Sequence, residues 1–303
     1  MIDLPARTRR VSGTRLLDLC RERGITSLVD PFMGVPVHLS VLKRHGIAVH
    51  GGDLLEWFVR AGEGLVVNDF TILRDAEVAE VVEMLPGRIY PTDLFRAWEG
   101  VFFSEDQCRY LSVWHANVHA LRSDGQTGLA LLGLWHVLCH WLLKARHPDE
   151  MLDVPPSELA WHHIRETERW VVSNGKRNTV RRADFATTLA AVRTDAVYLA
   201  PPGRSAAKRI DARVWMWEAW WQGDPYLNVE RLYRDTVFGG RINDDAGYDR
   251  AIADVLAASN APYLIVQSNP RESARTERLV AAQRPNVEIV TPNEDELYII
   301  GKK

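Results

Sequence analysis

Cysteine is scarce in this sequence, and the spacing of the few cysteines excludes two kinds of site. Only three of the 303 residues are cysteines, namely Cys20, Cys108 and Cys139. An odd number without paired spacing fits neither a disulfide framework nor a cysteine-based zinc site. We therefore expect a protein of a reducing compartment, the cytoplasm.

A long uninterrupted apolar segment is also missing. The longest apolar stretch, residues 129–143, contains His136 and His140 and is shorter than the ~18–20 residues that cross a bilayer. The arginines near the N-terminus precede no apolar run of the kind found in a signal peptide. The sequence thus predicts neither a membrane span nor a membrane partner.

Neither sign of charge predominates. The 37 basic and 40 acidic residues give a formal net charge of −3, so the molecule as a whole does not attract a polyanion, and any nucleic-acid contact has to come from local basic clusters. Such clusters lie at residues 7–15, 176–182 and 204–213, and each is about as typical of a solvated face. The candidate nucleic-acid-binding residues are Lys176, Arg177, Arg204, Lys208, Arg209 and Arg213.

What is present is a globular composition with an alternation of helices and strands. Hydrophobic residues make up 46% and charged residues 25% of the chain, as in folded α/β proteins. The pattern predicts a helix over 12–23 ended by Gly24, a strand over 27–30, a helix over 37–45 ended by Gly46, and a strand over 47–50. This order is a βαβ unit, in which the two strands are parallel.

The middle of the chain is mostly helical, and strands return afterwards. Apolar periodicity predicts helices over 76–84, 105–121 and 128–145. Buried parallel strands are predicted over 196–199 and 263–267, and a terminal pair over 287–290 and 297–300. We predict one α/β domain built from residues 1–70 and 174–303, with a helical insertion over 71–173.

The first βαβ turn has the layout of a nucleoside site. The first strand ends in Asp30, Gly34 lies in the turn, and Asp53 lies near the end of the second strand. In nucleoside-binding folds an acid about 20 residues after the turn accepts hydrogen bonds from the ribose hydroxyls. Pro36 occupies the place of a second glycine and lacks an N–H, which narrows how this loop could contact a ligand. By itself the turn is equally compatible with a βαβ connection without ligand.

Read in order, several segments resemble a known enzyme family. They are residues 30–34 (Asp-Pro-Phe-Met-Gly), 52–55 (Gly-Asp-Leu-Leu), 102–106 (Phe-Phe-Ser-Glu-Asp), 182–185 (Arg-Ala-Asp-Phe), 195–203 (Asp-Ala-Val-Tyr-Leu-Ala-Pro-Pro-Gly) and 265–269 (Ile-Val-Gln-Ser-Asn). This ordered set resembles the Dam-type DNA adenine methyltransferases, which use S-adenosylmethionine. The resemblance implies a Rossmann-like methyltransferase sheet, mostly parallel with an antiparallel edge, and a target-recognition role for the insertion. It assigns cofactor binding to Asp30, Phe32, Gly34, Asp53, Asp184 and Phe185.

The sequence departs from the family at the catalytic loop. The family's Asp-Pro-Pro-Tyr is here Ala200, Pro201, Pro202 and Gly203. In the family, the carboxylate accepts a hydrogen bond from the exocyclic amine of a flipped adenine, and the tyrosine stacks on the base. A methyl group accepts nothing, and the loss corresponds to at least ~10²–10³ in rate. Asp195 is five residues away along the strand, ~16 Å, too far to replace the carboxylate.

The resemblance therefore predicts an inactive or impaired homologue of a DNA adenine methyltransferase that binds nucleic acid or serves as the partner subunit of a catalytic methyltransferase. S-adenosylmethionine remains its expected cofactor. One alternative is an active amino-methyltransferase on DNA with an atypical catalytic loop. Another is a scaffold protein that binds neither ligand and uses a tryptophan-rich face for a partner.

Two further clusters have structural interpretations that we favour. His136, Cys139 and His140 share one helix, but no glutamate lies between the histidines, so we interpret them as packed core and predict no metal. Trp217, Trp220 and Trp221 fall on one helical face. Nucleobase stacking would use such a face, although a core stripe or subunit interface is more typical of this spacing.

Overall fold

The computed structural model describes residues 7–144, 154–200, 212–228, 245–268, 270–291 and 297–303. These residues form two compact units. The α/β unit comprises Thr8–Val59, Asn174–Asp211 and Asn228–Lys303, and the helical unit comprises Met1–Arg7, Arg60–Ser173 and Ala212–Leu227. The last of these segments contains α10 (Ala212–Gln222), so this helix groups with the helical unit although it follows the fourth strand in sequence.

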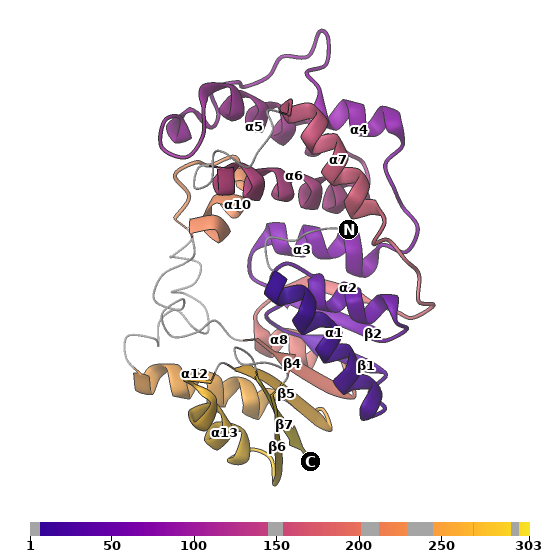
Figure 1. Cartoon of the computed structure of the whole chain (residues 1–303), viewed down its shortest axis with the longest axis vertical. Helices are drawn as coiled ribbons and strands as arrows, with labels where there is room; N and C mark the ends of the chain where they lie inside the picture. Colours follow the sequence, from indigo (N-terminus) through magenta and orange to yellow (C-terminus); the bar gives the residue numbers. More distant parts are fainter. Residues whose placement is uncertain (1–6, 145–153, 201–211, 229–244, 269, 292–296) are drawn as a thin grey trace. The chain divides into compact units, whose positions relative to one another are not determined.

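The α/β unit contains a single seven-stranded sheet (Figure 1). Its strands are β1 (Ser27–Asp30), β2 (Ala48–Asp53), β3 (Thr179–Arg182), β4 (Ala196–Leu199), β5 (Tyr263–Ser268), β6 (Asn286–Val290) and β7 (Leu297–Lys302). The order is β3-β2-β1-β4-β5-β7-β6. The first five strands in this order are parallel, and β7 runs antiparallel to both β5 and β6. The predicted fold class, an α/β fold with a Rossmann-like sheet that is mostly parallel and has an antiparallel edge, is confirmed.

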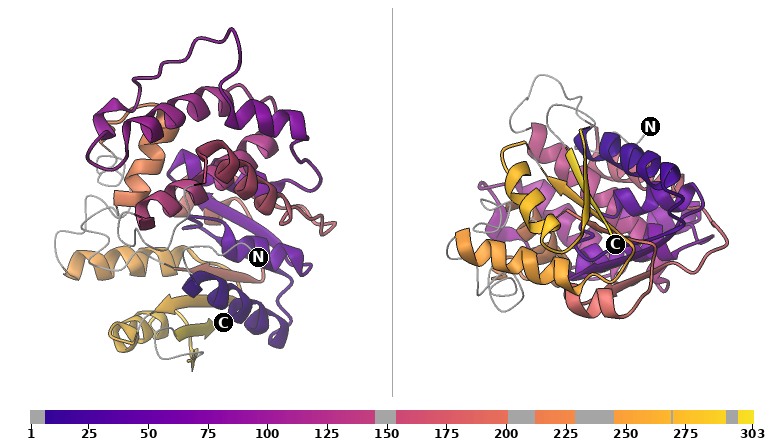
Figure 2. Two further views of the ribbon diagram at one scale, coloured as in Figure 1. Left: turned by 45° about the horizontal axis from the view of Figure 1, so that its top comes forward. Right: turned by 90° about the horizontal axis from the view of Figure 1, so that it is seen from below.

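Helices cover both faces of this sheet. The helices are α1 (Arg7–Glu22), α2 (Val37–Arg44), α8 (Phe185–Ala190), α12 (Asp245–Ala258) and α13 (Ser273–Ala281). A further helix, α3 (Glu56–Gly62), begins in this unit and ends in the helical unit. Figure 2 shows α1 on one side of the C-terminal strands and α12 with α13 on the other. The core on the α12 side is aliphatic and includes Val197, Leu264 and Ile299, which have almost no exposed surface. Burial on both faces explains why β4 and β5 read as continuous apolar runs.

Glycines end the first two helices, as the sequence predicted. Gly24 and Gly46 follow α1 and α2 with φ of +64° and +83°. Residues with a side chain rarely adopt these angles, so glycine allows the chain to turn directly into the next strand.

The helical unit is built around aromatic side chains. Its helices are α4 (Asp75–Val82), α5 (Glu105–Val118), α6 (Asp124–Lys144), α7 (Pro156–Glu168) and α10, with a π-helical turn η1 (Glu63–Val67) and a 3-10 turn η2 (Arg96–Trp98). Trp114 stacks on Trp141 with ring centroids 5.4 Å apart. Trp220 is fully buried and donates its indole N–H to the carbonyl of Leu111 at 3.0 Å. No helix among the described residues is long and apolar enough to cross a membrane.

Candidate functional site

The strand order of the sheet changes direction between β1 and β4. These strands are neighbours, and the order runs to β2 and β3 on one side and to β5 on the other. In open α/β sheets ligands bind outside the carboxyl ends of the strands at such a switch point. The residues at this edge are Asp30 at the end of β1, Asp53 at the end of β2 and Ala200 directly after β4.

The turn after β1 is fastened to the end of β2. Gly34 has φ of +54° and donates its N–H to Oδ2 of Asp53 at 3.0 Å. The N–H of Met33 donates to the carbonyl of Gly52 at 3.0 Å, and Oδ1 of Asp53 accepts the N–H of Leu55 at 3.0 Å. Each oxygen of the Asp53 carboxylate thus accepts a backbone N–H, one from the turn after β1 and one from the turn after β2.

Asp30 shapes the same turn from the other side. It is buried, and its Oδ1 accepts the N–H of Phe32 at 2.9 Å. The Phe32 ring lies 6.3 Å from that of Phe185, centroid to centroid. Phe185 is itself a buried member of the aliphatic core, with 7% of its surface exposed. The Phe185 ring therefore packs into the core next to Phe32 and has little surface available to a ligand.

The segment that contains Asp184 lies beside Asp53. The N–H of Ala183 donates to the main-chain carbonyl of Asp53 at 3.0 Å. Asp184 caps α8, because its Oδ1 accepts the N–H of Thr187 at 2.7 Å. Among the six predicted cofactor residues, contacts thus join Asp30, Phe32 and Phe185 on one side and Gly34 and Asp53 on the other. Asp184 directly follows Ala183, whose N–H binds Asp53.

Two glycines that the sequence analysis did not single out as functional make this arrangement sterically feasible. A Cβ on Gly52 would lie 2.2 Å from Oγ1 of Thr188, and a Cβ on Gly51 would lie 2.4 Å from Sδ of Met33. Both glycines therefore let flanking side chains pack directly onto β2. The Thr188 hydroxyl is buried there without a hydrogen-bond partner among the described residues.

Ala200, which stands in the place of the family's catalytic aspartate, carries no carboxylate and is half-buried. Pro201, Pro202 and Gly203 lie outside the described residues. Asp195 lies at the opposite end of β4, where its Oδ2 accepts the N–H and hydroxyl of Thr26 at 2.8 and 2.7 Å and the N–H of Ser27 at 3.0 Å. Burial alone would raise the pKa of Asp195, but these hydrogen bonds outweigh it and hold that pKa below its ordinary value. Asp195 is thus committed to the amino ends of the strands.

Tyr198 is the polar aromatic residue of β4. Its ring is fully buried, 5.4 Å from the His38 ring, and its hydroxyl donates to Oε1 of Gln267. Because the ring is buried, Tyr198 offers no surface for stacking on a base. The register of Leu199 with Val266 places Gln267 beside Ala200 on the neighbouring strand. Asn269, the last residue of the family-like segment, lies outside the described residues.

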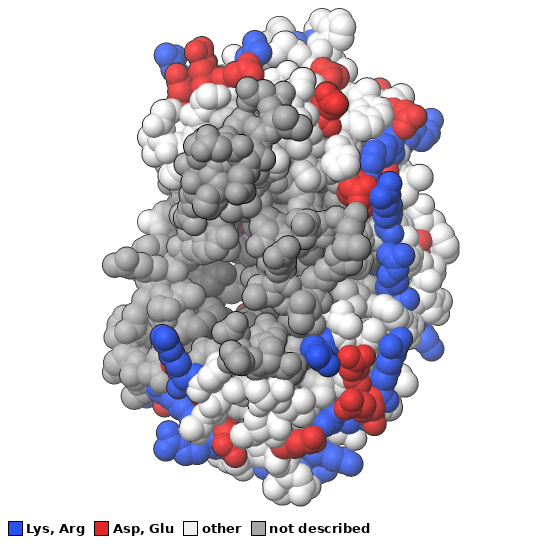
Figure 3. Space-filling model, in the orientation of Figure 1, with Lys and Arg blue, Asp and Glu red and all other residues white. Residues whose placement is uncertain are grey.

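The candidate nucleic-acid-binding residues fall into separate parts of the chain. Lys176 and Arg177 are exposed before β3, in the α/β unit, and no ion pair involves them among the described residues. The pKa of nearby His50 is lowered mainly by burial and to a smaller extent by the charges of Arg181 and Arg177. Arg204, Lys208 and Arg209 lie outside the described residues, as does the side chain of Arg213 on α10. On the face shown in Figure 3, basic and acidic side chains are interspersed.

Of the two histidines of α6, His136 is buried against α7, whereas His140 is half-buried and its ring lies 6.4 Å from that of His163. His136 is 5% exposed, and its ring stacks on that of His163 at 5.3 Å. Burial is the main cause that lowers the pKa of His136 to about 3, and the electrostatic effect of His163 is the smaller cause. The interpretation of His136 and Cys139 as packed core is confirmed by their burial. Within the part of the chain that the structure describes, no three histidine, cysteine or carboxylate side chains are arranged to hold a metal ion.

The tryptophans of α10 are also core residues. Trp217, Trp220 and Trp221 are 1%, 0% and 6% exposed. The core interpretation is therefore confirmed, and these rings have no free face for a nucleobase.

Comparisons with known proteins add little to this geometry. No family model matches the chain, and no curated protein matches it in sequence. Among solved structures, magnesium protoporphyrin IX methyltransferase (ChlM) from Synechocystis PCC 6803 with bound SAM is 7% identical, with a TM-score of 0.36 over 97% of this chain and 79% of that one. Two structures of the rRNA methyltransferase aviRa from Streptomyces viridochromogenes are 15% and 14% identical, with TM-scores of 0.32 and 0.33 over 95% of this chain and 84% of theirs. The fold assignment rests on the strand order and registers.

Proposed function

We propose that the α/β unit binds S-adenosylmethionine at the carboxyl ends of β1 and β2, and that the protein is an inactive or impaired homologue of a DNA adenine methyltransferase. The observation that carries this proposal is the connected set of contacts around Asp53, which joins the turn after β1 to the segment before α8. Such a set positions backbone and carboxylate groups next to one another before any ligand arrives.

The residues present fit the chemical groups of this cofactor. Asp53 is a carboxylate, the kind of acceptor that the two ribose hydroxyls, which are donors, require. Gly34 has no side chain to hinder close approach of a ligand to the backbone. Asp184 uses one carboxylate oxygen to cap α8. Its second oxygen can accept a hydrogen bond from the exocyclic amine of the adenine. When bound, the cofactor supplies an electrophilic methyl group on a sulfonium.

Methyl transfer to an exocyclic amine requires an acceptor that Ala200 does not provide. An acceptor beside the amine holds its lone pair toward the methyl group, and the methyl side chain of Ala200 cannot do so. Removal of one such preorganised group lowers a rate by ~10²–10³. Loss of the stacking surface at Gly203 removes a further ~1–3 kcal/mol of base binding. Both losses affect the same step.

DNA is the proposed partner of this protein, alone or together with a catalytic methyltransferase subunit. The support is the pair Lys176 and Arg177, which are exposed and lack an ion pair among the described residues. Contacts of this kind bind phosphates without reading sequence, and they weaken as salt rises.

One observation favours a second candidate, an active amino-methyltransferase with an atypical loop. Gln267 lies beside Ala200, and its carbonyl oxygen is already oriented by the Tyr198 hydroxyl. A carbonyl oxygen has two lone pairs, so Oε1 of Gln267 can accept a hydrogen bond from an amine as well as from Tyr198. In this candidate, Gln267 replaces the missing carboxylate.

Equilibrium dialysis with methyl-labelled S-adenosylmethionine tests the proposal, and the same label can be followed into adenine-containing duplex DNA. The proposal predicts retained cofactor and no label in DNA above background. Label in DNA that disappears in Gln267→Ala supports the second candidate. Failure to retain the cofactor contradicts both.

A further inference from the structure

Residues 67–73, which run from the last residue of η1 toward α4, present apolar side chains to solvent. We name this segment the Phe70 loop. Val67, Phe70 and Ile72 have 43%, 81% and 51% of their surface exposed, whereas Leu73 beside them is fully buried. Scattered single apolar residues on a surface need no explanation. By contrast, three exposed apolar side chains within one loop of seven residues do require an explanation when the backbone of that loop is held in place.

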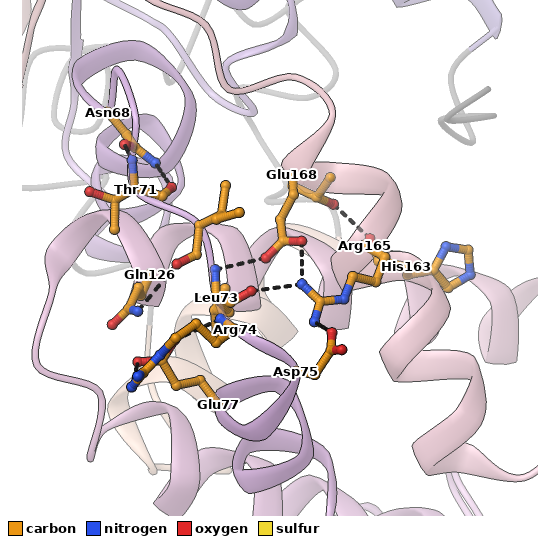
Figure 4. A network of polar contacts seen from close by, with 12 residues as sticks. Asn68, Thr71, Leu73, Arg74, Asp75, Glu77, Gln126, His163, Arg165 and Glu168 are labelled. Atoms are coloured by element: carbon orange, nitrogen blue, oxygen red, sulfur yellow. Dashed lines mark hydrogen bonds and ion pairs between the residues drawn. The ribbon is translucent and has the colours of Figure 1, made fainter.

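The first half of the Phe70 loop is held by Asn68. Oδ1 of Asn68 accepts the N–H of Phe70 at 3.2 Å and of Thr71 at 2.8 Å. Its Nδ2 donates to the carbonyl of Thr71 at 2.7 Å (Figure 4). Asn68 itself is 7% exposed, and a Cβ on Gly125 of α6 would touch its side chain at 3.2 Å. The turn that displays Phe70 is therefore anchored to the body of the helical unit.

The second half of the loop is held by α6 and α7. The N–H of Leu73 donates to Oε1 of Glu168 at 2.8 Å, and its carbonyl accepts from Arg165 at 2.7 Å (Figure 4). Gln126 donates to the carbonyl of Ile72 at 3.3 Å. Because both halves are fixed, a partner that contacts Phe70 does not have to order the loop, and a preorganised aromatic side chain is the kind of residue that dominates binding energy.

The charges around the loop indicate the kind of partner. The cations nearby already have acidic partners: Arg60 with Glu63 and Asp124, Arg74 with Glu77, and Arg165 with Asp75 and Glu168. Five carboxylates thus accompany three guanidinium groups in these ion pairs. An excess of negative charge repels phosphates and anionic lipids, and it attracts a surface with lysine or arginine at its rim.

We propose that the Phe70 loop docks a face of another protein that is apolar at its centre and rimmed by lysine or arginine. Phe70 and Ile72 contact the apolar centre, and the surrounding carboxylates meet the basic rim. This surface lies within the helical unit, and its use does not depend on cofactor binding by the α/β unit.

Fluorescence anisotropy with a labelled amphipathic helical peptide, one face leucine and the other lysine, tests the proposal on the full chain. We expect saturable binding that weakens by roughly tenfold or more in Phe70→Ala and with rising salt. A peptide with glutamate in place of lysine should not bind. The matched control is Ile89→Ala, since Ile89 is 95% exposed in the same unit and should leave binding unchanged.

Several outcomes would overturn the proposal. They are no binding of the leucine and lysine peptide, equal binding by the parent and Phe70→Ala, and equal losses in Phe70→Ala and Ile89→Ala. Single-stranded oligonucleotide, phosphatidylcholine vesicles and self-association by sedimentation are measured in parallel. Binding of any of these that is lost in Phe70→Ala assigns the loop to that other partner. Circular dichroism verifies that each variant is folded.

Discussion

The two units of this protein satisfy their polar groups in different ways. In the α/β unit, carboxylates at the ends of strands accept backbone N–H groups, as Asp195 does at the amino ends and Asp53 at the carboxyl ends. In the helical unit, polar aromatic groups such as His136 and Trp220 are buried among other rings. The α/β unit thus places carboxylates at the ends of its strands, whereas the helical unit buries imidazoles in addition to its carboxylate–arginine pairs.

Within the α/β unit, the two ends of β4 repeat this contrast on a smaller scale. The amino end keeps a carboxylate with three hydrogen bonds, and the carboxyl end has only the methyl group of Ala200. The carboxylate that supports the sheet is present, and the proposed loss of methyl transfer rests on Ala200 in the place of the family's aspartate. Structure and chemistry are therefore separable by substitution in this chain.

The largest expected effect comes from restoring the missing groups. Ala200→Asp combined with Gly203→Tyr should raise methyl transfer to adenine-containing DNA by ~10²–10³ over the parent, because the amine regains an acceptor and the base a stacking surface. Transfer of labelled methyl groups measures this. Ala200→Leu with Gly203→Tyr is the matched control and should stay at background. Equal rates in the two double variants would show that Ala200 does not line the reactive corner.

The next effect should appear in the helical unit as the pH falls. Burial and His163 lower the pKa of His136 to about 3, whereas the unfolded chain has a histidine pKa of about 6.5. Between these values the unfolded state binds more protons, so the free energy of unfolding decreases as pH decreases. We expect a loss on the order of 2 kcal/mol between about pH 7 and about pH 5.

Tryptophan fluorescence during urea unfolding follows this loss selectively. Of the eleven tryptophans, only Trp57 lies outside the helical unit. Burial also lowers the pKa of His163, to about 4, so His136→Leu should reduce the pH dependence without abolishing it. His45→Leu, at an exposed position of the α/β unit, should leave the dependence unchanged. The same dependence in all three proteins would refute the contrast between the units.

The smallest effect is expected at the amino end of β4. Asp195→Ala removes the acceptor of three hydrogen bonds and should lower the free energy of unfolding by about 1–2 kcal/mol, because the site is partly open to water. Asp195→Asn keeps one carbonyl oxygen and should lose less. Urea unfolding followed by circular dichroism compares the two. A loss in Asp195→Asn as large as that in Asp195→Ala would indicate that charge, and not hydrogen bonding, stabilises this corner.

The sequence predicted most strands and the glycine-ended helices, because apolar runs and glycines are local signals. It did not reveal β3, whose residues Thr179–Arg182 are half-exposed at a sheet edge and include two arginines. Nor could it show that α10 belongs with the helical unit, since that depends on side chains distant in sequence, such as Leu111.

The residues of the candidate site could be named from the sequence, but their contacts could not. Asp30, Gly34 and Asp53 followed from the βαβ layout and from the family resemblance. The use of both Asp53 oxygens by the N–H groups of Gly34 and Leu55 could not be foreseen, because it depends on how the two turns face each other. The burial of Phe185 likewise depends on residues from β4, β5 and α12.

The central claim is that the carboxyl edge around Asp53 binds S-adenosylmethionine, and calorimetric titration of the matched pair Asp53→Asn and Asp195→Asn tests it most directly. The account predicts saturable binding by the parent and by Asp195→Asn, and an affinity roughly ten to one hundred times lower in Asp53→Asn. Binding that is equally strong in all three proteins, or absent from the parent, would contradict it.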